Sequence, residues 1–391
     1  MHMHAGPAST PAPAEPRAVV AEILRRHGPA YLRDHAVTPA QGKALRAAMA
    51  CRTAALGGHL DVCRDCGWSK PSYNSCRDRH CPTCQSSQAA AWLEGRVRRV
   101  LPTHYFHVVF TLPAPLRAVA LANPRIVYDL LFDAASSTLL ELGASRLGAR
   151  LGITAVLHTW TREMLLHPHL HCVVTGGGLR LDDQGWVGCK GAFLFPVRVM
   201  GALFRGKFMD GLVRAQRKGT LHFVGSSAGL ADPAAFARLR ATLYATDWVV
   251  FAKRPFGGPE QVLRYLSRYT HRVAISDARI LHASDDRVVI RTRGDRSASM
   301  RPAEFIRRLL LHVLPTQLRK IRHYGLLAPA NVNTRLALAR RALGGEARGE
   351  ELPKDSPLTV AEEPMPVPRC PACGSEQLRR EHVPVLPRGP P

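Results

Sequence analysis

Apolar residues recur along the chain with two periodicities, one of helices and one of strands. In residues 18–50, apolar side chains recur at helical spacing, and we expect two short helices that Gly28-Pro29 separates. Residues 192–215 mix a short strand with a helix. The patterns further predict helices over 86–100, 124–148, 233–243, 259–270, 302–314 and 316–324, and strands over 105–112, 153–160, 169–175, 220–224, 247–252, 273–282 and 286–293.

These helices and strands are intermixed without the regular alternation of a parallel α/β protein. We therefore expect an α+β fold, in which a mostly antiparallel sheet is flanked by helices. The segments divide into a disordered leader (1–17), a helical and cysteine-rich module (18–100), a larger core (101–344) and a flexible tail (345–391). The leader and the tail are rich in proline and small or charged residues, a composition that is typical of disorder.

Charge narrows the range of partners. The 391 residues include 54 Lys and Arg against 30 Asp and Glu, which gives a formal net charge of +24. Such an excess favours a polyanionic partner, with nucleic acid first and an anionic membrane surface as the rival. The sequence has no apolar run long enough to span a bilayer, and its first residues lack the apolar centre of a signal peptide. We expect a cytoplasmic protein that acts on DNA and does not bind membranes.

Cysteines are concentrated near the N-terminus. The pairs Cys63/Cys66 and Cys81/Cys84 each have the CxxC spacing, and fourteen residues separate them. Each pair places two thiolates on one tight turn, and two such turns complete a tetrahedral site, so these four cysteines are the expected ligands of a structural Zn²⁺. Arg77 and Arg79 lie between the pairs and are candidate DNA contacts.

Other possible zinc ligands remain open. Cys76, His80 and His59 lie near the two pairs and could replace a ligand or build a second site. His80 could instead hydrogen-bond a cysteine ligand without contacting the metal. A further pair, Cys370/Cys373, has no evident partner, and His382 is a weak candidate as its third ligand, so we assign no site there.

A histidine pair lies in the predicted strand over 169–175. His169 and His171 flank Leu170, and because alternate residues of a strand face the same way, both imidazoles point to one surface. Neutral imidazole binds divalent ions and leaves coordination positions open for substrate oxygen. The predicted metal is Mg²⁺ or Mn²⁺.

The third ligand of this metal would come from a neighbouring strand. His158 is the first choice, because its strand should pair with the strand of His169 and His171. Glu163 and His167 are the alternatives.

Two tyrosines share one face of the helix predicted over 259–270. Tyr265 and Tyr269 are one turn apart, and Arg264, Arg268 and Arg272 lie close to them. The usual roles of such a pair are core packing or base stacking. Cations that favour phenolate would instead allow a tyrosine to attack a phosphodiester, which gives a phosphotyrosine and a free hydroxyl. Because the phosphotyrosine linkage retains the energy of the phosphodiester bond, the DNA strand could be rejoined without ATP.

In combination, these motifs resemble one known family. Segments within residues 45–330 are similar to the bacterial rolling-circle transposases of the insertion-sequence ninety-one type, among the histidine-hydrophobic-histidine tyrosine nucleases. The matching segments read RTAALGGHLDVCRDCG, SYNSCRDRHCPTCQ, THYFHVVFTLP, VLHTW, HPHLHCVVTGGGL, FGGPEQVLRYLSRYTHRVAIS and KIRHYGLL.

The resemblance implies an N-terminal zinc-binding domain followed by a transposase domain that cuts single-stranded DNA at element ends with a divalent metal. It implies His169 and His171 as metal ligands and Tyr265 and Tyr269 as nucleophiles, whereas His158 is our own inference. The expected activity is metal-dependent nicking and rejoining through a 5′-phosphotyrosine, on DNA associated with the bacterial nucleoid. The oligomeric state stays open.

Three alternatives use some of the same residues. A replication initiator or a relaxase would carry out the same chemistry, and the cysteine module ahead of the core argues for the transposase. A non-catalytic zinc protein would use the tyrosines to stack bases. A barrel-type metallohydrolase also has paired strand histidines, but the sequence lacks repeated βα units.

Overall fold

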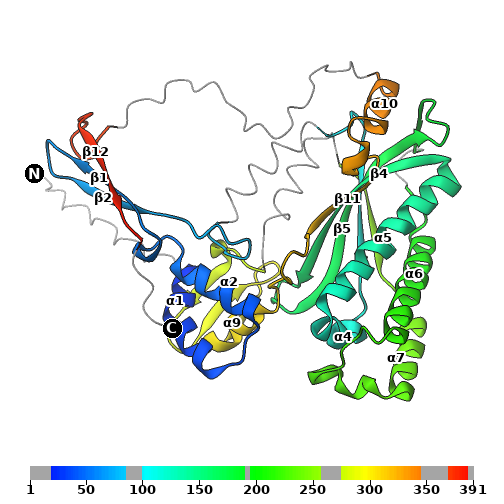
Figure 1. The fold of residues 1–391 in the computed structure, drawn as a ribbon, viewed down its shortest axis with the longest axis horizontal. Helices are drawn as coiled ribbons and strands as arrows, with labels where there is room; N and C mark the ends of the chain where they lie inside the picture. Colours follow the sequence, from blue (N-terminus) through cyan, green and yellow to red (C-terminus); the bar gives the residue numbers. More distant parts are fainter. Residues whose placement is uncertain (1–18, 85–98, 190–193, 257–273, 345–368, 386–391) are drawn as a thin grey trace, which may run out of the picture.

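The structure is a computed structural model that describes residues 19–84, 99–189, 194–256, 274–344 and 369–385. Within these residues, three antiparallel sheets and their helices form a large core, a smaller helical unit and a narrow arm (Figure 1). Helices and mostly antiparallel sheets confirm the expected α+β class.

The largest sheet has six strands. Its main path runs β11-β4-β5-β3-β7, with β6 paired to β5, so β5 lies at its centre. The bounds are β3 (Tyr105–Thr111), β4 (Ala149–Trp160), β5 (Leu166–Arg180), β6 (Trp186–Gly188), β7 (Val250–Phe256) and β11 (Ile321–Gly325). The expected strands over 105–112, 153–160, 169–175 and 247–252 are thus present, and β5 continues through the three glycines at 176–178.

One face of this sheet packs against two long helices, α5 (Pro124–Leu147) and α6 (Val197–Arg217), as Figure 1 shows. Phe110 and Leu170 point to this face and share a core with Phe132 of α5 and Phe204 of α6. Because strand side chains alternate between faces, the same strands place their histidines on the opposite face. The burial of one face therefore fixes which residues the other face presents.

The N-terminal helices do not fold with the cysteine region alone. Helix α1 (Val20–Asp34) and helix α2 (Pro39–Ala50) share a hydrophobic core with α9 (Pro302–Leu310) and a small sheet. That sheet consists of β8 (Ile280–Ala283), β9 (Val288–Arg291) and β10 (Ser297–Met300). The expected domain boundary near residue 100 therefore does not describe the N-terminal unit fully, because residues 274–310 also pack in it.

Helix α1 continues through Gly28-Pro29, where we expected a break. A Cβ built on Gly28 would lie 2.5 Å from Sδ of Met49 in α2, so glycine permits close packing of the two helices. The helices separate instead just before Thr38, whose side chain accepts a hydrogen bond from the Gln41 N–H and caps α2.

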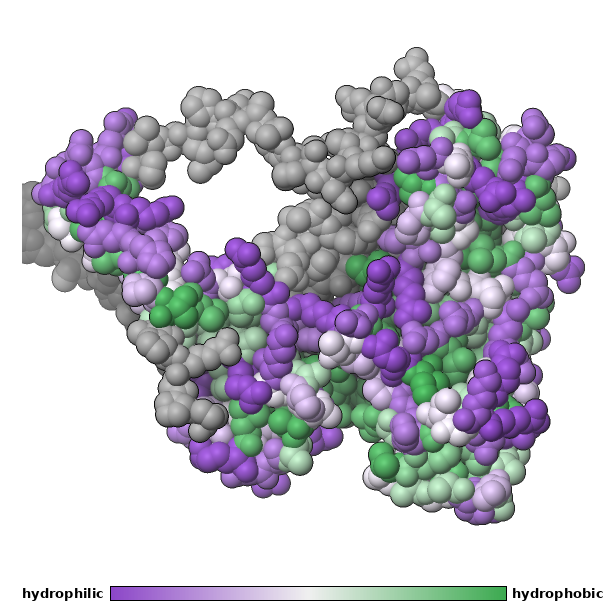
Figure 2. All heavy atoms as spheres, viewed as in Figure 1, coloured by the Kyte–Doolittle hydropathy of each residue, from purple (hydrophilic) through white to green (hydrophobic). Residues whose placement is uncertain are grey.

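The narrow arm brings together a segment near the N-terminus and a segment near the C-terminus, each with a CxxC pair. It is a sheet in the order β12-β1-β2, formed by β1 (Gly58–Cys63), β2 (Ser69–Tyr73) and β12 (Leu378–Val383). The expectation of a flexible tail beyond 345 is wrong for residues 369–385, since β12 pairs with β1 over six residues. Figure 2 shows mainly hydrophilic side chains over this arm.

Two other local expectations are wrong. The helix expected over 316–324 is replaced by β11, which pairs with β4 and completes an edge of the large sheet. Residues 220–224 do not join a strand. The remaining elements are η1 (Ala54–Leu56), η2 (Ala114–Leu116), α4 (Arg117–Ala122), η3 (Gly225–Ala231), α7 (Pro233–Ala245), η4 (Asp277–Arg279), η5 (Pro329–Asn331) and α10 (Arg335–Ala342).

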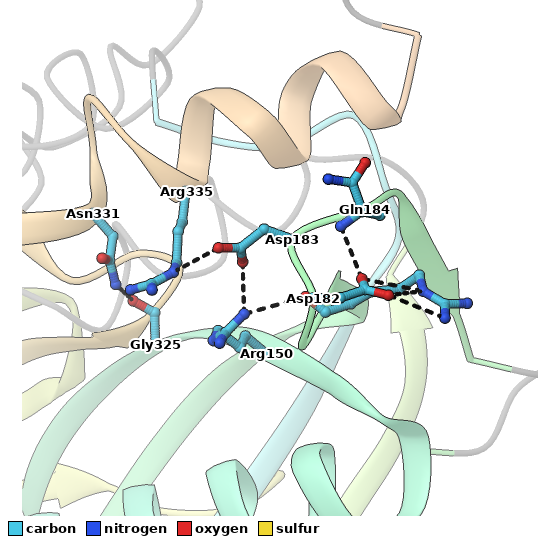
Figure 3. A network of polar contacts seen from close by, with 8 residues as sticks. Arg150, Asp182, Asp183, Gln184, Gly325, Asn331 and Arg335 are labelled. Atoms are coloured by element: carbon cyan, nitrogen blue, oxygen red, sulfur yellow. Dashed lines mark hydrogen bonds and ion pairs between the residues drawn. The ribbon is translucent and has the colours of Figure 1, made fainter.

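A polar network fixes helix α10 to the end of the sheet (Figure 3). Asp183 accepts from Arg150 of β4 at 2.6 Å and lies 3.5 Å from the Arg335 guanidinium of α10. Nearby, the Asn331 side-chain amide donates to the Gly325 carbonyl at 2.7 Å. These contacts stabilise the end of β4 and β5 that lies away from the histidines.

None of the helices in the described part of the chain combines the length and the apolar character needed to cross a lipid bilayer.

Candidate metal centres

Three histidines converge on the sheet face opposite α5 and α6. His169 lies directly opposite His158 in the β4–β5 register, and His171 follows two residues along β5. One ring nitrogen from each of the three lies within 4.8 Å of the others. The expected strand pairing of His158 with His169 is confirmed, and neither Glu163 nor His167 belongs to this group.

Hydrogen bonds fix how the rings of this group point. The Nδ1 atom of His169 lies 2.7 Å from the carbonyl oxygen of His167, and Nδ1 of His171 lies 2.8 Å from Nε2 of His107. A hydrogen bond at Nδ1 leaves the Nε2 lone pair for a ligand. The ring of His158 stacks on Trp160, with a centroid distance of 4.7 Å.

The site keeps its imidazoles neutral. Burial lowers the pKa of His107 and of His169 to about 4, and burial together with His169 and His107 lowers the pKa of His171 further. All three values lie well below 7, so the lone pairs are available at neutral pH, as metal binding requires.

This donor set fits a divalent ion. Three imidazole nitrogens are suitable ligands for first-row divalent metals, and three protein ligands leave coordination positions for substrate oxygen. His158 is buried, whereas His169 and His171 are half-buried.

Sequence reasoning missed two residues beside this group. His107 lies on β3 in the motif THYFHVVFTLP and faces the same side as His171. Lys320 places its ammonium 5.0 Å from the centroid of the Trp160 ring, and burial lowers its pKa to about 7. Because the strand over 105–112 was predicted, the alternation of its side chains could have indicated which face His107 occupies. Lys320 lay in a segment that we expected to be helical.

His107 is a positioning residue, and its removal should weaken metal binding. In His107→Phe the ring shape is kept but the partner of His171 Nδ1 is lost, so we expect the affinity for Mn²⁺ to fall about 10- to 100-fold. Calorimetric titration with Mn²⁺ would measure this. His323→Phe removes a comparable contact, 3.0 Å to Thr154, on the same sheet and is the control. Equal affinity in both variants would contradict the role.

The cysteines form two groups, and neither is the expected one. Cys81 and Cys84 lie with Cys51 and Cys76, whereas Cys63 and Cys66 lie with Cys370 and Cys373. The predicted set of Cys63, Cys66, Cys81 and Cys84 is therefore wrong as a single site. The reason is that β1 carries the first CxxC pair away from the helices and into the arm, where β12 brings the second pair.

The first group, which we call the inner cysteine group, consists of Cys51, Cys76, Cys81 and Cys84. The Sγ atom of Cys84 lies 3.5 Å from that of Cys51 and 3.6 Å from that of Cys76. The hydrogen bond from the Cys76 thiol lowers the pKa of Cys81, which favours the thiolate that metal binding needs. Four such sulfurs fit a closed structural zinc site.

Two residues between these cysteines connect the inner cysteine group to the large sheet. The Arg79 guanidinium donates to the carbonyls of Leu318 at 2.6 Å and Pro315 at 2.8 Å. His80 Nε2 accepts from the Leu314 N–H at 3.1 Å, so His80 points away from the sulfurs. Arg79, which we expected to contact DNA, thus binds the segment that leads into β11.

The remaining candidate residues are only partly described. Arg77 is exposed beside the inner cysteine group and stays a candidate DNA contact. The predicted nucleophiles Tyr265 and Tyr269 and the cations Arg264, Arg268 and Arg272 lie outside the described residues. The segment that carries them begins after Phe256, at the end of β7, and ends before the buried Ala274.

Two family models match the chain. One, described as "Putative transposase", matches residues 152–335, and the other, described as "Transposase zinc-binding domain", matches residues 23–112. The first therefore spans the three histidines, and the second spans the inner cysteine group together with Cys63 and Cys66 but does not reach Cys370.

Two similar proteins agree with these models. "Putative transposase y4qJ" of Sinorhizobium fredii is 49% identical over 334 residues, which are 83% of this chain and 84% of that protein. "Transposase for insertion sequence element IS801" of Pseudomonas savastanoi pv. phaseolicola is 28% identical over 289 residues, 72% of this chain and 68% of that protein. No solved structure matches.

Proposed function

Because the chain belongs to the IS91-type family of insertion-sequence transposases, we propose that it nicks and rejoins single-stranded DNA at element ends during rolling-circle transposition. The observation that carries this proposal is the convergence of His158, His169 and His171 on one face of the large sheet. Such a group suits a cation-assisted phosphodiester reaction, since DNA cleavage requires charge stabilisation at the phosphate.

A divalent metal ion would contribute to the reaction by acting on the phosphate group. His158, His169 and His171 would hold Mg²⁺ or Mn²⁺, and the bound ion would polarise the phosphoryl oxygens of the scissile linkage. The chain's own groups orient these ligands, because His107 and the His167 carbonyl fix the rings of His171 and His169. The amine of Lys320, when protonated, would add positive charge beside the Trp160 ring that stacks on His158.

Tyr265 and Tyr269 are the proposed nucleophiles. The phenolate oxygen of one tyrosine attacks the phosphorus, a bond from that oxygen to phosphorus forms, and the bond to the 3′ oxygen breaks. The 3′ oxygen takes up a proton, which leaves a free 3′-hydroxyl and a 5′-phosphotyrosine. Attack by a 3′-hydroxyl reverses the step and rejoins the strand, while the second tyrosine allows a second transfer.

The described ends of the segment with both tyrosines support this proposal. Phe256 lies opposite Tyr105 of β3, next to Thr175 of β5, whereas the buried Ala274 packs in the cluster that contains Met164, beyond the turn between β4 and β5. These two ends therefore lie at opposite ends of the strands that carry His158 and His169. The three histidines therefore lie between the two described residues that flank the tyrosine segment.

The inner cysteine group is the proposed site of the structural Zn²⁺ of the zinc-binding domain. With Arg77 exposed beside it, this domain would contact the DNA near the cleavage site. We also propose that the protein acts in the cytoplasm on nucleoid-associated DNA, with element ends and target DNA as its partners.

A covalent-adduct assay tests the function. The full chain is incubated with Mn²⁺ or Mg²⁺ and an end-labelled oligonucleotide that carries an element end, either single-stranded or annealed to its complement. We expect a denaturant-resistant protein–DNA adduct with the single strand, and mass spectrometry of tryptic peptides should locate the DNA on Tyr265 or Tyr269.

The result also separates the alternatives. DNA binding without an adduct under either metal would overturn the proposal and favour the non-catalytic zinc protein. An adduct that forms equally well on the duplex would contradict the single-strand preference. A replication initiator or relaxase would give an adduct on plasmid origins rather than on element ends.

A further inference from the structure

We propose that Cys63, Cys66, Cys370 and Cys373, which we call the arm cysteine group, hold a second zinc ion that fastens residues 369–385 to β1. The proposal is independent of the nicking activity, because it rests on the geometry of the arm alone. The family model for the zinc-binding domain ends at residue 112, so it does not include half of these ligands.

The sulfur positions fit tetrahedral coordination. Sγ of Cys63 lies 3.7 Å from Sγ of Cys373, and Sγ of Cys66 lies 3.7 Å from Sγ of Cys370. Four thiolates at about 2.3 Å from one zinc ion would lie about 3.8 Å from each other. Disulfide sulfurs would lie only about 2.05 Å apart, so the arrangement does not correspond to two disulfides.

The two halves of the site are built on the same kind of turn. After Cys66, the Gly67 N–H donates to the Cys63 carbonyl at 3.0 Å, and after Cys373 the Gly374 N–H donates to the Cys370 carbonyl at 2.8 Å. Both glycines adopt positive φ angles, 72° and 76°, which a side chain would disfavour. Each turn therefore presents two sulfurs from one side, as a zinc knuckle does.

The two turns also bind each other directly, through one backbone and one side-chain hydrogen bond. The Arg64 N–H donates to the Gln377 carbonyl at 3.0 Å, and the Ser375 hydroxyl donates to the Asp65 carboxylate. Beyond them, β12 pairs with β1 from Cys63↔Leu378 to Gly58↔Val383. The four sulfurs therefore lie at one end of a continuous strand pairing.

The arm lacks the apolar core that normally holds such a sheet together. In β1, β2 and β12 the buried residues are Gly58 and Cys63 alone, the rest of β1 is half-buried, and most side chains of β2 and β12 are exposed. Small sheets of this kind need packing against another layer, a disulfide or a metal. Cys63 and Cys370 are almost fully buried at 1% and 3% exposure, whereas Cys66 and Cys373 are exposed, so one cysteine of each pair is buried where the two turns meet.

Zinc stoichiometry tests the proposal. After dialysis against a weak chelator, which removes ions held loosely by histidines, mass spectrometry of the metal content should give two zinc ions per chain. Cys370→Ser/Cys373→Ser should give one, and Cys63→Ser/Cys66→Ser should also give one. The variant that combines all four substitutions should again give one, because both pairs serve the same ion.

Cys189→Ser changes a cysteine outside both groups and should retain two zinc ions. Cys76→Ser/Cys84→Ser should remove the inner ion only. Two ions in Cys370→Ser/Cys373→Ser would overturn the proposal, and so would loss of both ions in the variant with four substitutions, since the pairs would then serve different ions.

Hydrogen exchange gives a second readout that does not depend on counting metal. In Cys370→Ser/Cys373→Ser, amides of β1 and β12 should exchange faster than in the wild-type chain, whereas amides of α5 should be unchanged. The unchanged helix shows that the core remains folded. Equal protection of β1 and β12 in both proteins would contradict a role of the metal in fastening the segment.

Discussion

His171→Ala is expected to reduce nicking of a single-stranded element end about 1,000-fold. The change removes one of the three proposed metal ligands, and a metal ion contributes several kcal/mol to such a reaction, where each 1.4 kcal/mol corresponds to a factor of ten. Initial rates of product formation on a denaturing gel, at saturating DNA and a fixed Mn²⁺ concentration, would measure the loss.

The effect should be specific to the chemical step. DNA affinity, measured by fluorescence anisotropy, should stay close to that of the wild-type chain, because the net charge of +24 is unchanged by this substitution. His282→Ala removes a more exposed histidine of β8 that lies outside the three-histidine group and serves as the control. Nicking at the wild-type rate in His171→Ala would exclude the group as the catalytic centre.

Tyr265→Phe/Tyr269→Phe is expected to abolish the covalent protein–DNA adduct, with a loss on the order of 10⁴-fold, as is typical when a covalent nucleophile is removed. Phenylalanine keeps the ring, and therefore packing and stacking, but has no oxygen to bond to phosphorus. The measurement is the yield of adduct after denaturation. The two single variants would show whether one tyrosine or both attack.

A matched control separates chemistry from folding. Tyr244→Phe removes a hydroxyl from an exposed tyrosine of α7 and should leave the adduct yield unchanged. If the double variant still formed an adduct, the nucleophile would be another residue. If the double variant also lost its affinity for DNA, the tyrosines would have a role in binding the DNA.

Local signals in the sequence predicted much of the large sheet. The β-branched and aromatic run over 105–112 and the alternation around His169 gave the strands, and the expected pairing of two strands placed His158 beside the histidine pair. This worked because antiparallel neighbours in sequence have short connections, so pairing follows from order along the chain.

Contacts between distant segments could not be predicted in this way. Cys63 and Cys66 were paired with the next CxxC motif along the chain, whereas the fold pairs them with Cys370 and Cys373. Gly28-Pro29 read as a break, yet packing of α1 on α2 keeps the helix intact. In each case the deciding interaction came from tertiary packing, which outweighs local preference.

The pairing of β12 with β1 has a consequence for synthesis of the protein. Cys63 and Cys373 are 310 residues apart. Ribosomes add roughly 5–20 residues per second, so the N-terminal hairpin would wait about 15–60 s for its last strand. Throughout that interval the Cys63 and Cys66 thiols can be oxidised and the unpaired edge of β1 can pair with a neighbouring nascent chain, so completion of the arm depends on a reducing environment.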